Sequence, residues 1–200
     1  MSPMSKEKIQ KSRRECIIRA ALAAYGEKGI FSTRIEEVAI AAGIGKGTIY
    51  EYFRSKEELM FAAIRFDMEE LAGQIKQSVD REVSVRGKLK VMVEAVMLHN
   101  RQNRYPRLDM SFTNMGSSMK DLQNLILEQN ARWRGWLEEI IELGVASGEI
   151  RPVDSRLFLG ALLGTVIHLV QPWDDSEWKT IPPGDAAERV TEFFFKGIGK

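Results

Sequence analysis

The sequence contains little cysteine and little histidine, and each scarcity excludes a class of protein. Its 200 residues include one cysteine and two histidines. A single cysteine, Cys16, cannot form an internal disulfide, so a disulfide-stabilised secreted fold is excluded and a reducing cytoplasm is the simplest setting. We expect Cys16 to be a small core residue rather than a reactive thiol. His99 and His168 lie in separate predicted helices without metal-ligand spacing, so neither a metal site nor a cofactor is expected.

Long apolar segments and strand-like alternation are also missing. The longest apolar run, Leu157–Val170, has 14 residues and is interrupted by two glycines, a threonine and a histidine. Such a run is too short to span a bilayer and predicts a buried helix, so no membrane partner is expected. The basic N-terminus has no apolar segment after it, unlike a signal peptide. Because no segment alternates with a period of two residues, the sequence predicts an all-α fold.

Catalytic motifs are absent as well. The chain has no Gly-x-Ser-x-Gly elbow and no phosphate-binding glycine loop. The paired acids Glu138 and Glu139 are most simply part of a solvated helix face. We therefore expect a protein that binds other molecules rather than an enzyme.

Helical periodicity divides the chain into two sets of helices. Gly29 is expected to end the first helix, and Asp185 followed by Glu188 predicts the start of the last one. The first set occupies residues 1–55 and the second residues 56–200, with the boundary inside or near a long helix. The expected longer helices cover residues 6–28, 56–79, 83–102, 104–114, 118–147, 155–170 and 186–198.

Two short helices joined by a tight turn are predicted after the first helix. Thr33 and Glu36 have the spacing of a capping box, which predicts a helix start near Arg34. The apolar residues that follow form one stripe, and Gly43 is suited to the left-handed conformation that ends a helix. A second short helix is then expected over residues 45–52.

This second short helix has an inner apolar face and an outer polar face. Ile49 and Phe53 are four residues apart and point to the core. Lys46, Thr48 and Tyr50 lie on the other faces and offer donors, acceptors and an aromatic hydroxyl. A helix-turn-helix of this kind fits the major groove of B-DNA, where side chains reach base edges. The pattern predicts a DNA-binding module.

The next helix start is also suited to DNA. Ser55 and Glu58 have the spacing of a capping box and begin the long helix. Backbone amides at that start, together with Lys56, make a site suited to a phosphate. Gly45 and Gly47 remove side chains from the start of the preceding helix, so its backbone can approach a phosphate closely.

One stretch resembles the DNA-binding signature of the tetracycline-repressor (TetR) family of bacterial transcription regulators: TRIEEVAIAAGIGKGTIYEYFRSKEEL, from Thr33 to Leu59. The resemblance implies an N-terminal three-helix DNA-binding domain over residues 1–55. A long helix would join it to a larger C-terminal domain over residues 56–200 that binds an effector and dimerises. The residues implied to contact DNA are Thr33, Arg34, Gly45, Lys46, Gly47, Thr48, Tyr50, Tyr52 and Lys56. Family members usually carry serine or threonine at Gly45, so a side-chain cap is missing, at a cost of about a few tenths of a kcal/mol.

The first predicted helix also carries a basic cluster. A solvated face and a contact with the DNA backbone are equally compatible with such a cluster beside a DNA-binding motif. Its members are Lys6, Lys8, Lys11, Arg13 and Arg14.

The C-terminal set of helices is rich in methionine and tryptophan. For any single residue core packing is the simpler interpretation, but together these residues favour an adaptable apolar cavity. The candidate ligand is a small apolar or amphipathic effector, and its polar part would meet His99, Tyr105 or His168. The apolar candidates are Met97, Met110, Phe112, Met115, Met119, Trp133 and Trp136.

The last two predicted helices are the candidate dimer interface. Gly160 and Gly164 permit close approach of helices, and the two helices carry more apolar surface than one side of a core should need. Burial within a single subunit is a credible alternative for about half of the positions. The candidates are Phe158, Leu162, Leu163, Val166, Leu169, Phe193 and Phe194.

Composition, motif and resemblance together predict a homodimeric, cytoplasmic regulator of transcription. It would bind a pseudo-palindromic operator in double-stranded DNA and, acting as a repressor, leave that operator when a small effector binds. The alternative is a helical dimeric sensor or scaffold that has lost DNA binding.

Overall fold

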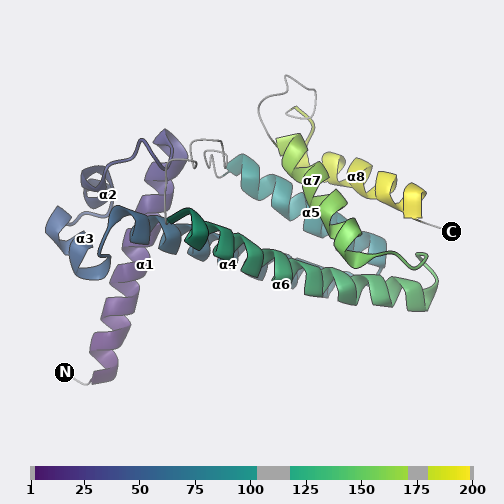
Figure 1. Cartoon of the computed structure of the whole chain (residues 1–200), viewed down its shortest axis with the longest axis horizontal. Helices are drawn as coiled ribbons and strands as arrows, with labels where there is room; N and C mark the ends of the chain where they lie inside the picture. Colours follow the sequence, from purple (N-terminus) through teal and green to yellow (C-terminus); the bar gives the residue numbers. More distant parts are fainter. Residues whose placement is uncertain (1–2, 103–117, 171–179, 199–200) are drawn as a thin grey trace. The chain divides into compact units, whose positions relative to one another are not determined.

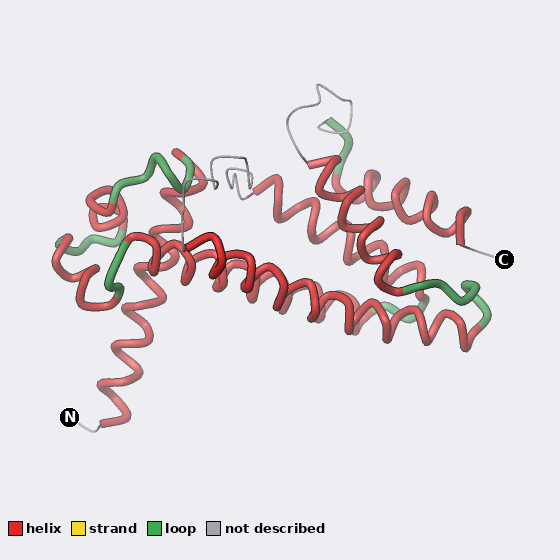
Figure 2. The backbone as a smooth tube through the Cα atoms, viewed as in Figure 1, coloured by secondary structure: helices red, strands yellow, loops and turns green. Residues whose placement is uncertain are grey.

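The structure is a computed structural model that describes residues 3–102, 118–170 and 180–198, and every regular element within these ranges is an α-helix (Figures 1 and 2). The predicted all-α fold is confirmed. The helices are α1 (Pro3–Lys28), α2 (Ile35–Ala41), α3 (Lys46–Tyr52), α4 (Lys56–Arg81), α5 (Val85–Gln102), α6 (Ser118–Ser147), α7 (Ser155–Val170) and α8 (Pro183–Ile198). Within the described ranges no helix is long and apolar enough to cross a membrane.

Most predicted helix bounds agree with the structure to within three residues. The expected helix 104–114 lies outside the described residues. The cap predicted at Asp185 is wrong, because α8 begins at Pro183 and Asp185 already lies in its first turn. Proline is favoured at the first position of a helix, where its missing N–H is not needed. Cys16 was also predicted wrongly: it lies in α1 but is exposed rather than in the core.

The chain forms two compact units, each with its own core. Of the described residues, 3–69 and 118–122 belong to the N-terminal unit, and 70–102, 123–170 and 180–198 belong to the C-terminal unit. The division falls within α4 and near the start of α6, so each of these two helices contributes residues to both units.

The core of the N-terminal unit is built from the inner faces of α1, α2, α3 and the beginning of α4. Its largest fully buried side chains are Tyr25, Phe53, Ile17, Ile49 and Leu59. Burying a side chain of this size contributes about 1.5–3 kcal/mol, so a few residues from each short helix suffice to hold the helices together. α2 and α3 have seven residues each and depend on this packing, because isolated helices of that length are not stable in water.

Gly43 makes the turn between α2 and α3. Its φ is +67°, a left-handed conformation in which a side chain would be strained, as predicted from the sequence. The Gly43 N–H donates to the Ile40 carbonyl at 3.1 Å, and the Ile44 N–H donates to the Ala39 carbonyl at 3.0 Å. These bonds satisfy the last carbonyls of α2 and fix the direction in which the chain enters α3. Gly29, with φ of +91°, ends α1 in a similar way.

The core of the C-terminal unit joins α5, α6, α7 and α8 with the end of α4. Its fully buried side chains include Ile75, Leu89, Met97, Leu137 and Ile150. Phe158 of α7 and Phe194 of α8 meet edge to face, with ring centroids 5.2 Å apart. α8 packs along α5, as Figure 1 shows within this unit.

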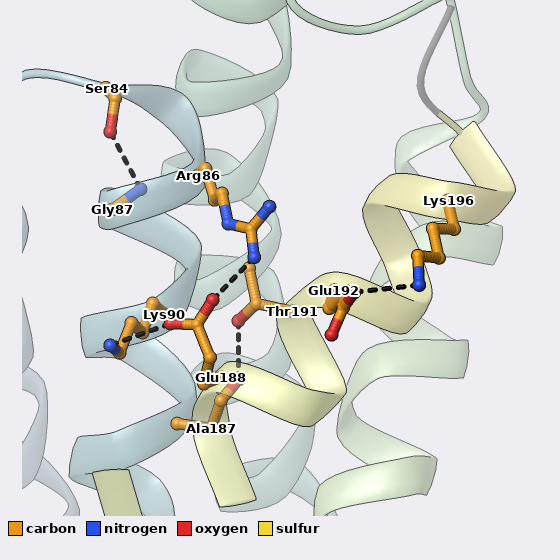
Figure 3. Close-up of polar contacts among 9 residues, drawn as sticks. All are labelled: Ser84, Arg86, Gly87, Lys90, Ala187, Glu188, Thr191, Glu192 and Lys196. Carbon is orange, nitrogen blue, oxygen red and sulfur yellow. Dashed lines mark hydrogen bonds and ion pairs between the residues drawn. The ribbon is translucent and has the colours of Figure 1, made fainter. Parts of the chain in front are cut away.

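Ion pairs tie α8 to α5 at the surface of the C-terminal unit (Figure 3). The Glu188 carboxylate accepts from Lys90 Nζ at 2.7 Å and from Arg86 Nη2 at 2.5 Å. One carboxylate thus joins two cations on successive turns of α5. Glu192, one turn further along α8, pairs with Lys196 at 2.7 Å.

Candidate nucleic-acid interface

α3 turns one face to the core and the other to solvent. Ile49 has no exposed surface and anchors the helix among the buried residues of α1 and α2. On the outer face Lys46 and Gly47 are exposed, Thr48 is half-buried, and 46% of the Tyr50 surface is accessible. The predicted split of this helix into an inner apolar and an outer polar face is therefore what the structure contains.

The start of α3 is open to close approach by another molecule. Gly45 precedes the helix with φ of −74° and ψ of 150°, and no side chain caps the helix there. A Cβ atom added at Gly47 would meet no atom within 4 Å. The folded chain itself does not require glycine at this position. The space that a side chain would fill is therefore available to an outside partner such as a DNA backbone.

The start of α2 differs from the prediction in one respect. Arg34, and not Thr33, precedes the helix, and its N–H donates to Glu37 Oε2 at 2.8 Å. Thr33 is buried, and its hydroxyl donates to the Gly29 carbonyl at 2.7 Å and to the Ala24 carbonyl at 3.2 Å. The prediction of Thr33 as a DNA contact is therefore wrong for its side chain, which instead closes the end of α1. The Arg34 side chain is exposed beside it.

Two ion pairs connect α2 to its neighbours. Glu36 Oε1 lies 2.5 Å from Lys46 Nζ, and Glu37 pairs with Lys28 at the end of α1. The bond to Lys46 holds the pKa of the Glu36 carboxyl below its usual value and raises the pKa of the Lys46 ammonium. The Arg34 N–H, followed by Lys28, lowers the pKa of Glu37. Both glutamates are therefore charged at neutral pH, and Glu36 brings a negative charge to the outer face of α3.

The start of α4 has the predicted cap from Ser55, but the Glu58 carboxylate reaches Arg54, one residue before the position that a capping box requires. Ser55 Oγ accepts from the Glu58 N–H at 3.1 Å, and Glu58 Oε2 accepts from the Arg54 N–H at 2.7 Å. Lys56 Nζ donates to the Phe31 carbonyl at 3.1 Å, so its ammonium is held beside the loop that precedes α2. Tyr52 is half-buried against the core, with part of its side chain accessible.

Part of the basic cluster on α1 packs against the core rather than lying fully in solvent. The Arg14 guanidinium lies over the Phe53 ring, 4.8 Å from its centroid. Arg19, which is not a member of the predicted basic cluster, lies at the same distance over Phe66 of α4. Such contacts orient the arginines along the helix surface beside α3 and α4 of the same unit.

α2, the turn at Gly43 and α3 form a helix-turn-helix, and the starts of α2 and α4 beside it are capped. Bacterial regulatory proteins of the tetR family match residues 17–63, from the middle of α1 into α4. The chain belongs to the tetR family.

Relatives cover nearly the whole tetR-family chain. A fatty acid metabolism regulator protein of Bacillus subtilis (strain 168) is 25% identical over 189 residues, which are 91% of this chain and 93% of the relative. The crystal structure of the transcriptional regulator FadR from Bacillus subtilis in complex with stearoyl-CoA has a TM-score of 0.73 at 23% identity, and covers 92% of this chain and 98% of its own.

A second solved structure holds DNA. AibR in complex with isovaleryl coenzyme A and operator DNA has a TM-score of 0.68 at 20% identity, and covers 90% of this chain and 97% of its own. These structures share the fold. The predicted family, the helical architecture and the role in transcription are confirmed: this tetR-family chain is a DNA-binding transcriptional regulator.

Three of the predicted effector residues come together in the core of the C-terminal unit. Met97 and Trp133 are buried, and Trp136 is half-buried against the same cluster. His99 is half-exposed on α5. Four candidates lie outside the described residues, and the side chains of two more are not described. The first four are Tyr105, Met110, Phe112 and Met115, and the other two are Met119 in α6 and His168 in α7.

Gln129 is a buried polar residue that is not among the predicted site residues. It lies one turn before Trp133 on the core face of α6 and is 2% exposed, and its Oε1 has no hydrogen-bond partner among the described residues. The available signal was a polar residue on an otherwise apolar helix stripe. A hollow of about 110 Å³ lies by Met92, Trp136 and Ile140. It is smaller than the ~300–1,000 Å³ typical of ligand pockets. Among the described side chains no group of three or more histidines, cysteines or acids could hold a metal.

The predicted dimer residues divide into buried and accessible ones. Four of them were assigned wrongly, because they fill the core of their own unit and have almost no accessible surface: Phe158, Leu162, Val166 and Phe194. Leu163 and Leu169 are partly buried. Phe193 is 70% exposed on α8, and Leu157, which the prediction omitted, is 74% exposed on α7. Gly160 and Gly164 follow Leu157 along the same exposed side of α7.

Proposed function

We propose that this tetR-family regulator is a homodimeric repressor that an acyl-coenzyme A thioester releases from its operator. Each subunit would place α3 in the major groove of one half-site of a pseudo-palindromic duplex. The half-sites would lie about one helical turn or somewhat more apart, because paired helix-turn-helix modules read DNA at that spacing. The protein would act in the cytoplasm.

The outer face of α3 is the observation that carries the DNA-binding part of this proposal. Lys46, Gly47 and Tyr50 are exposed while Ile49 is fully buried, so the helix cannot turn its outer face inward without losing its anchor. Side chains of these types reach base edges or phosphates, and Arg34 is exposed at the neighbouring helix start. The other proposed contacts are Gly45, Thr48, Tyr52 and Lys56.

The effector class is proposed from the chemistry of the core and from the relatives. Met97, Trp133 and Trp136 gather in the C-terminal unit, and such side chains suit an acyl chain. The solved relatives hold stearoyl-CoA and isovaleryl coenzyme A, which share the thioester and differ in the acyl part. The predicted apolar or amphipathic effector is consistent with this class.

Gln129 gives the proposed effector site a polar partner. A buried amide oxygen without a hydrogen bond costs about 1–3 kcal/mol, so a leucine at this position would be the more stable choice. The polar residue is understandable if a ligand supplies the missing donor. Coenzyme A thioesters carry hydroxyl and amide N–H groups next to an acyl chain, and either group could donate to Gln129 Oε1.

The proposed dimer interface is the accessible apolar side of α7 and α8. Leu157 and Phe193 present large apolar side chains to solvent, and Gly160 and Gly164 leave room for a partner helix. Two copies of this face would cover each other in a symmetric, self-complementary contact. Leu163 and Leu169, which are partly buried, would lie at its edge.

One experiment tests the proposal as a whole. The purified protein selects duplexes from a random pool, and the enriched sequence is examined for two inverted half-sites. Binding to the selected duplex should weaken steeply with salt, because phosphate contacts release counterions. Stearoyl-CoA, isovaleryl-CoA and free coenzyme A are then added, and an acyl thioester should release the DNA while free coenzyme A does not. A stable dimer that enriches no sequence would favour a sensor or scaffold without DNA binding.

A further inference from the structure

The ion pair between Glu36 and Lys46 places a carboxylate within the proposed DNA interface. Glu36 Oε1 is 2.5 Å from Lys46 Nζ, and the side chains are 53% and 52% exposed. Glu36 belongs to the first turn of α2 and Lys46 is the first residue of α3, so the pair spans the turn of the helix-turn-helix. An exposed pair of this kind adds little to folding stability. Its presence on a surface that should attract phosphates calls for another explanation.

Glu37 shows that the neighbouring glutamate is used differently. Its carboxylate accepts from the Arg34 N–H and pairs with Lys28, so it holds the start of α2 and the end of α1. Glu36 makes neither contact. Two adjacent glutamates therefore have separate partners, one directed to the scaffold of the domain and one to the helix that faces DNA.

A lysine at the start of α3 has two possible partners on a duplex. It can pair with a phosphate, which carries no sequence information, or it can reach the acceptor atoms of a guanine in the major groove. The phosphate is the stronger electrostatic attraction for an unrestrained ammonium. A carboxylate at 2.5 Å balances the charge of Lys46 and repels phosphates from the same place.

We propose that Glu36 is a specificity-determining residue, which keeps Lys46 from binding phosphates and directs it toward a base edge. The inference rests on the proposed binding of duplex DNA by α3. In non-specific complexes, which depend on phosphate contacts, the pair removes one cation from the interface. In the specific complex Lys46 contacts a base while Glu36 still balances its charge. Glu36 thus lowers binding to wrong sequences more than binding to the operator.

The test compares Glu36→Gln with the matched control Glu37→Gln in the full-length protein. The binding of each variant to a selected duplex and to a scrambled duplex of equal length and composition is measured by fluorescence anisotropy. The salt concentration is varied from about 50 to about 400 mM, so that the slope of affinity against salt can be determined. Glu36→Gln should bind the scrambled duplex about 3–10-fold more tightly, and its salt slope should steepen by about 0.9, the value for one added phosphate contact. The ratio of selected to scrambled affinity should fall. Glu37→Gln should change neither the slope nor the ratio.

A second comparison separates a specific role from a general loss of negative charge. In a Lys46→Gln background, Glu36→Gln should have no effect on the salt slope or the affinity ratio. Equal changes with and without Lys46, or an unchanged ratio in Glu36→Gln, would overturn the inference while leaving the regulator assignment intact. A parent protein that selects no duplex would instead contradict the proposed function, and this inference with it. Equal unfolding midpoints for all variants would establish that folding is not the cause.

Discussion

The indole rings of Trp133 and Trp136 meet edge to face on α6, with centroids 5.6 Å apart and planes inclined by 70°. Trp133 is buried in the core of the C-terminal unit and Trp136 is only half-buried. Edge-to-face contact is a favourable arrangement for aromatic rings. A movement of one ring should therefore change the surroundings of the other. The pair links the buried interior of the unit to its surface.

An effector that enters this core should change the emission of Trp133. Titration with stearoyl-CoA is expected to alter the fluorescence of the parent protein, and Trp133→Phe should lose most of the change. Trp136→Phe is the comparison variant: since its ring lies nearer to solvent, this variant should lose a smaller part of the change. A response that survives in Trp133→Phe would place the acyl chain elsewhere.

Gln129→Leu should separate effector binding from folding. Removing the unpaired amide should leave the free energy of unfolding unchanged or raise it by about 1–3 kcal/mol, because no buried acceptor then lacks a donor. The affinity for stearoyl-CoA should fall several-fold, because one hydrogen bond to the ligand is lost. Calorimetry and denaturant unfolding measure the two quantities.

Gln123→Leu serves as its control, since Gln123 lies on α6 but is exposed. It should leave ligand affinity unchanged. If Gln129→Leu stabilises the protein and binds stearoyl-CoA as tightly as the parent, the amide is a structural feature, and an ordered water is the better explanation for its unused acceptor.

Gly47→Ala should stabilise the protein and weaken DNA binding. A Cβ atom at this position meets nothing in the folded chain, and alanine is favoured over glycine in a helix by up to about 1 kcal/mol. The same methyl group would stand where the DNA backbone is proposed to approach, so operator affinity should fall at least several-fold, on the order of 1 kcal/mol or more.

Gly73→Ala is the matched control in α4. Gly73 is exposed, helical and equally free of close neighbours, so its substitution should raise stability by a similar amount. Operator binding should be unchanged. Equal operator affinity in Gly47→Ala and Gly73→Ala would exclude close approach of DNA at the start of α3.

The helices of this protein were predictable because their signals are local. Gly29 and Gly43 have positive φ in the structure, and a glycine after an apolar stripe is the usual sign of that conformation. The cap that Ser55 gives to the Glu58 N–H was also found from spacing alone. Each of these features depends on residues within about one turn, so no knowledge of the tertiary structure is needed.

The side chains that were wrongly assigned depend on contacts between distant segments. Threonine is a residue type that often caps helices, but the Thr33 hydroxyl donates to a carbonyl at the end of α1. Arg34 and Glu37 form the start of α2 instead. In the sequence Phe158 and Leu162 are interpreted as surplus apolar surface, but in the structure α5 and α8 cover them. The partner of Glu36 lies ten residues away across a turn, so no helical spacing predicts the pair.

Glu188 should make the contact between α5 and α8 sensitive to acid. Lys90 and then Arg86 hold the pKa of its carboxyl below the usual value. The unfolded chain therefore takes up the proton at a higher pH, so the stabilisation is present above about pH 4.5 and is lost as the pH falls through the folded pKa. Glu188→Gln should lower the thermal midpoint at pH 7 by no more than about 2–4 °C and reduce the acid sensitivity.

The measurement is thermal unfolding between about pH 3 and 7, a range that brackets the usual carboxyl pKa. The control is Glu142→Gln, an exposed residue of α6 for which a similar change of charge should leave the acid dependence near that of the parent. If Glu188→Gln and Glu142→Gln give the same pH profile as the parent, the ion pairs shown in Figure 3 do not contribute to stability in solution.

Tyr25 should make the N-terminal unit sensitive to alkali. The residue is buried, and within the described part of the chain its hydroxyl has no hydrogen-bond partner. Burial, followed by the charge of Glu57, raises the pKa of the phenol well above 10. Below pH 10 the phenol is neutral in both states and its contribution is complete. Above pH 10 only the unfolded chain ionises, so the free energy of unfolding should fall by about 1.4 kcal/mol for each further pH unit.

Tyr25→Phe isolates this effect from the lysines, which titrate in the same range. At pH 7 the variant should be as stable as the parent or more stable by up to about 1 kcal/mol, because the phenylalanine ring fills the site without an unpaired hydroxyl. Between about pH 9 and 11 the parent should lose stability faster than the variant, as measured by denaturant unfolding. A parallel decline of the two proteins would mean that water or another donor reaches the hydroxyl, and that the core around α1 is more open than its burial indicates.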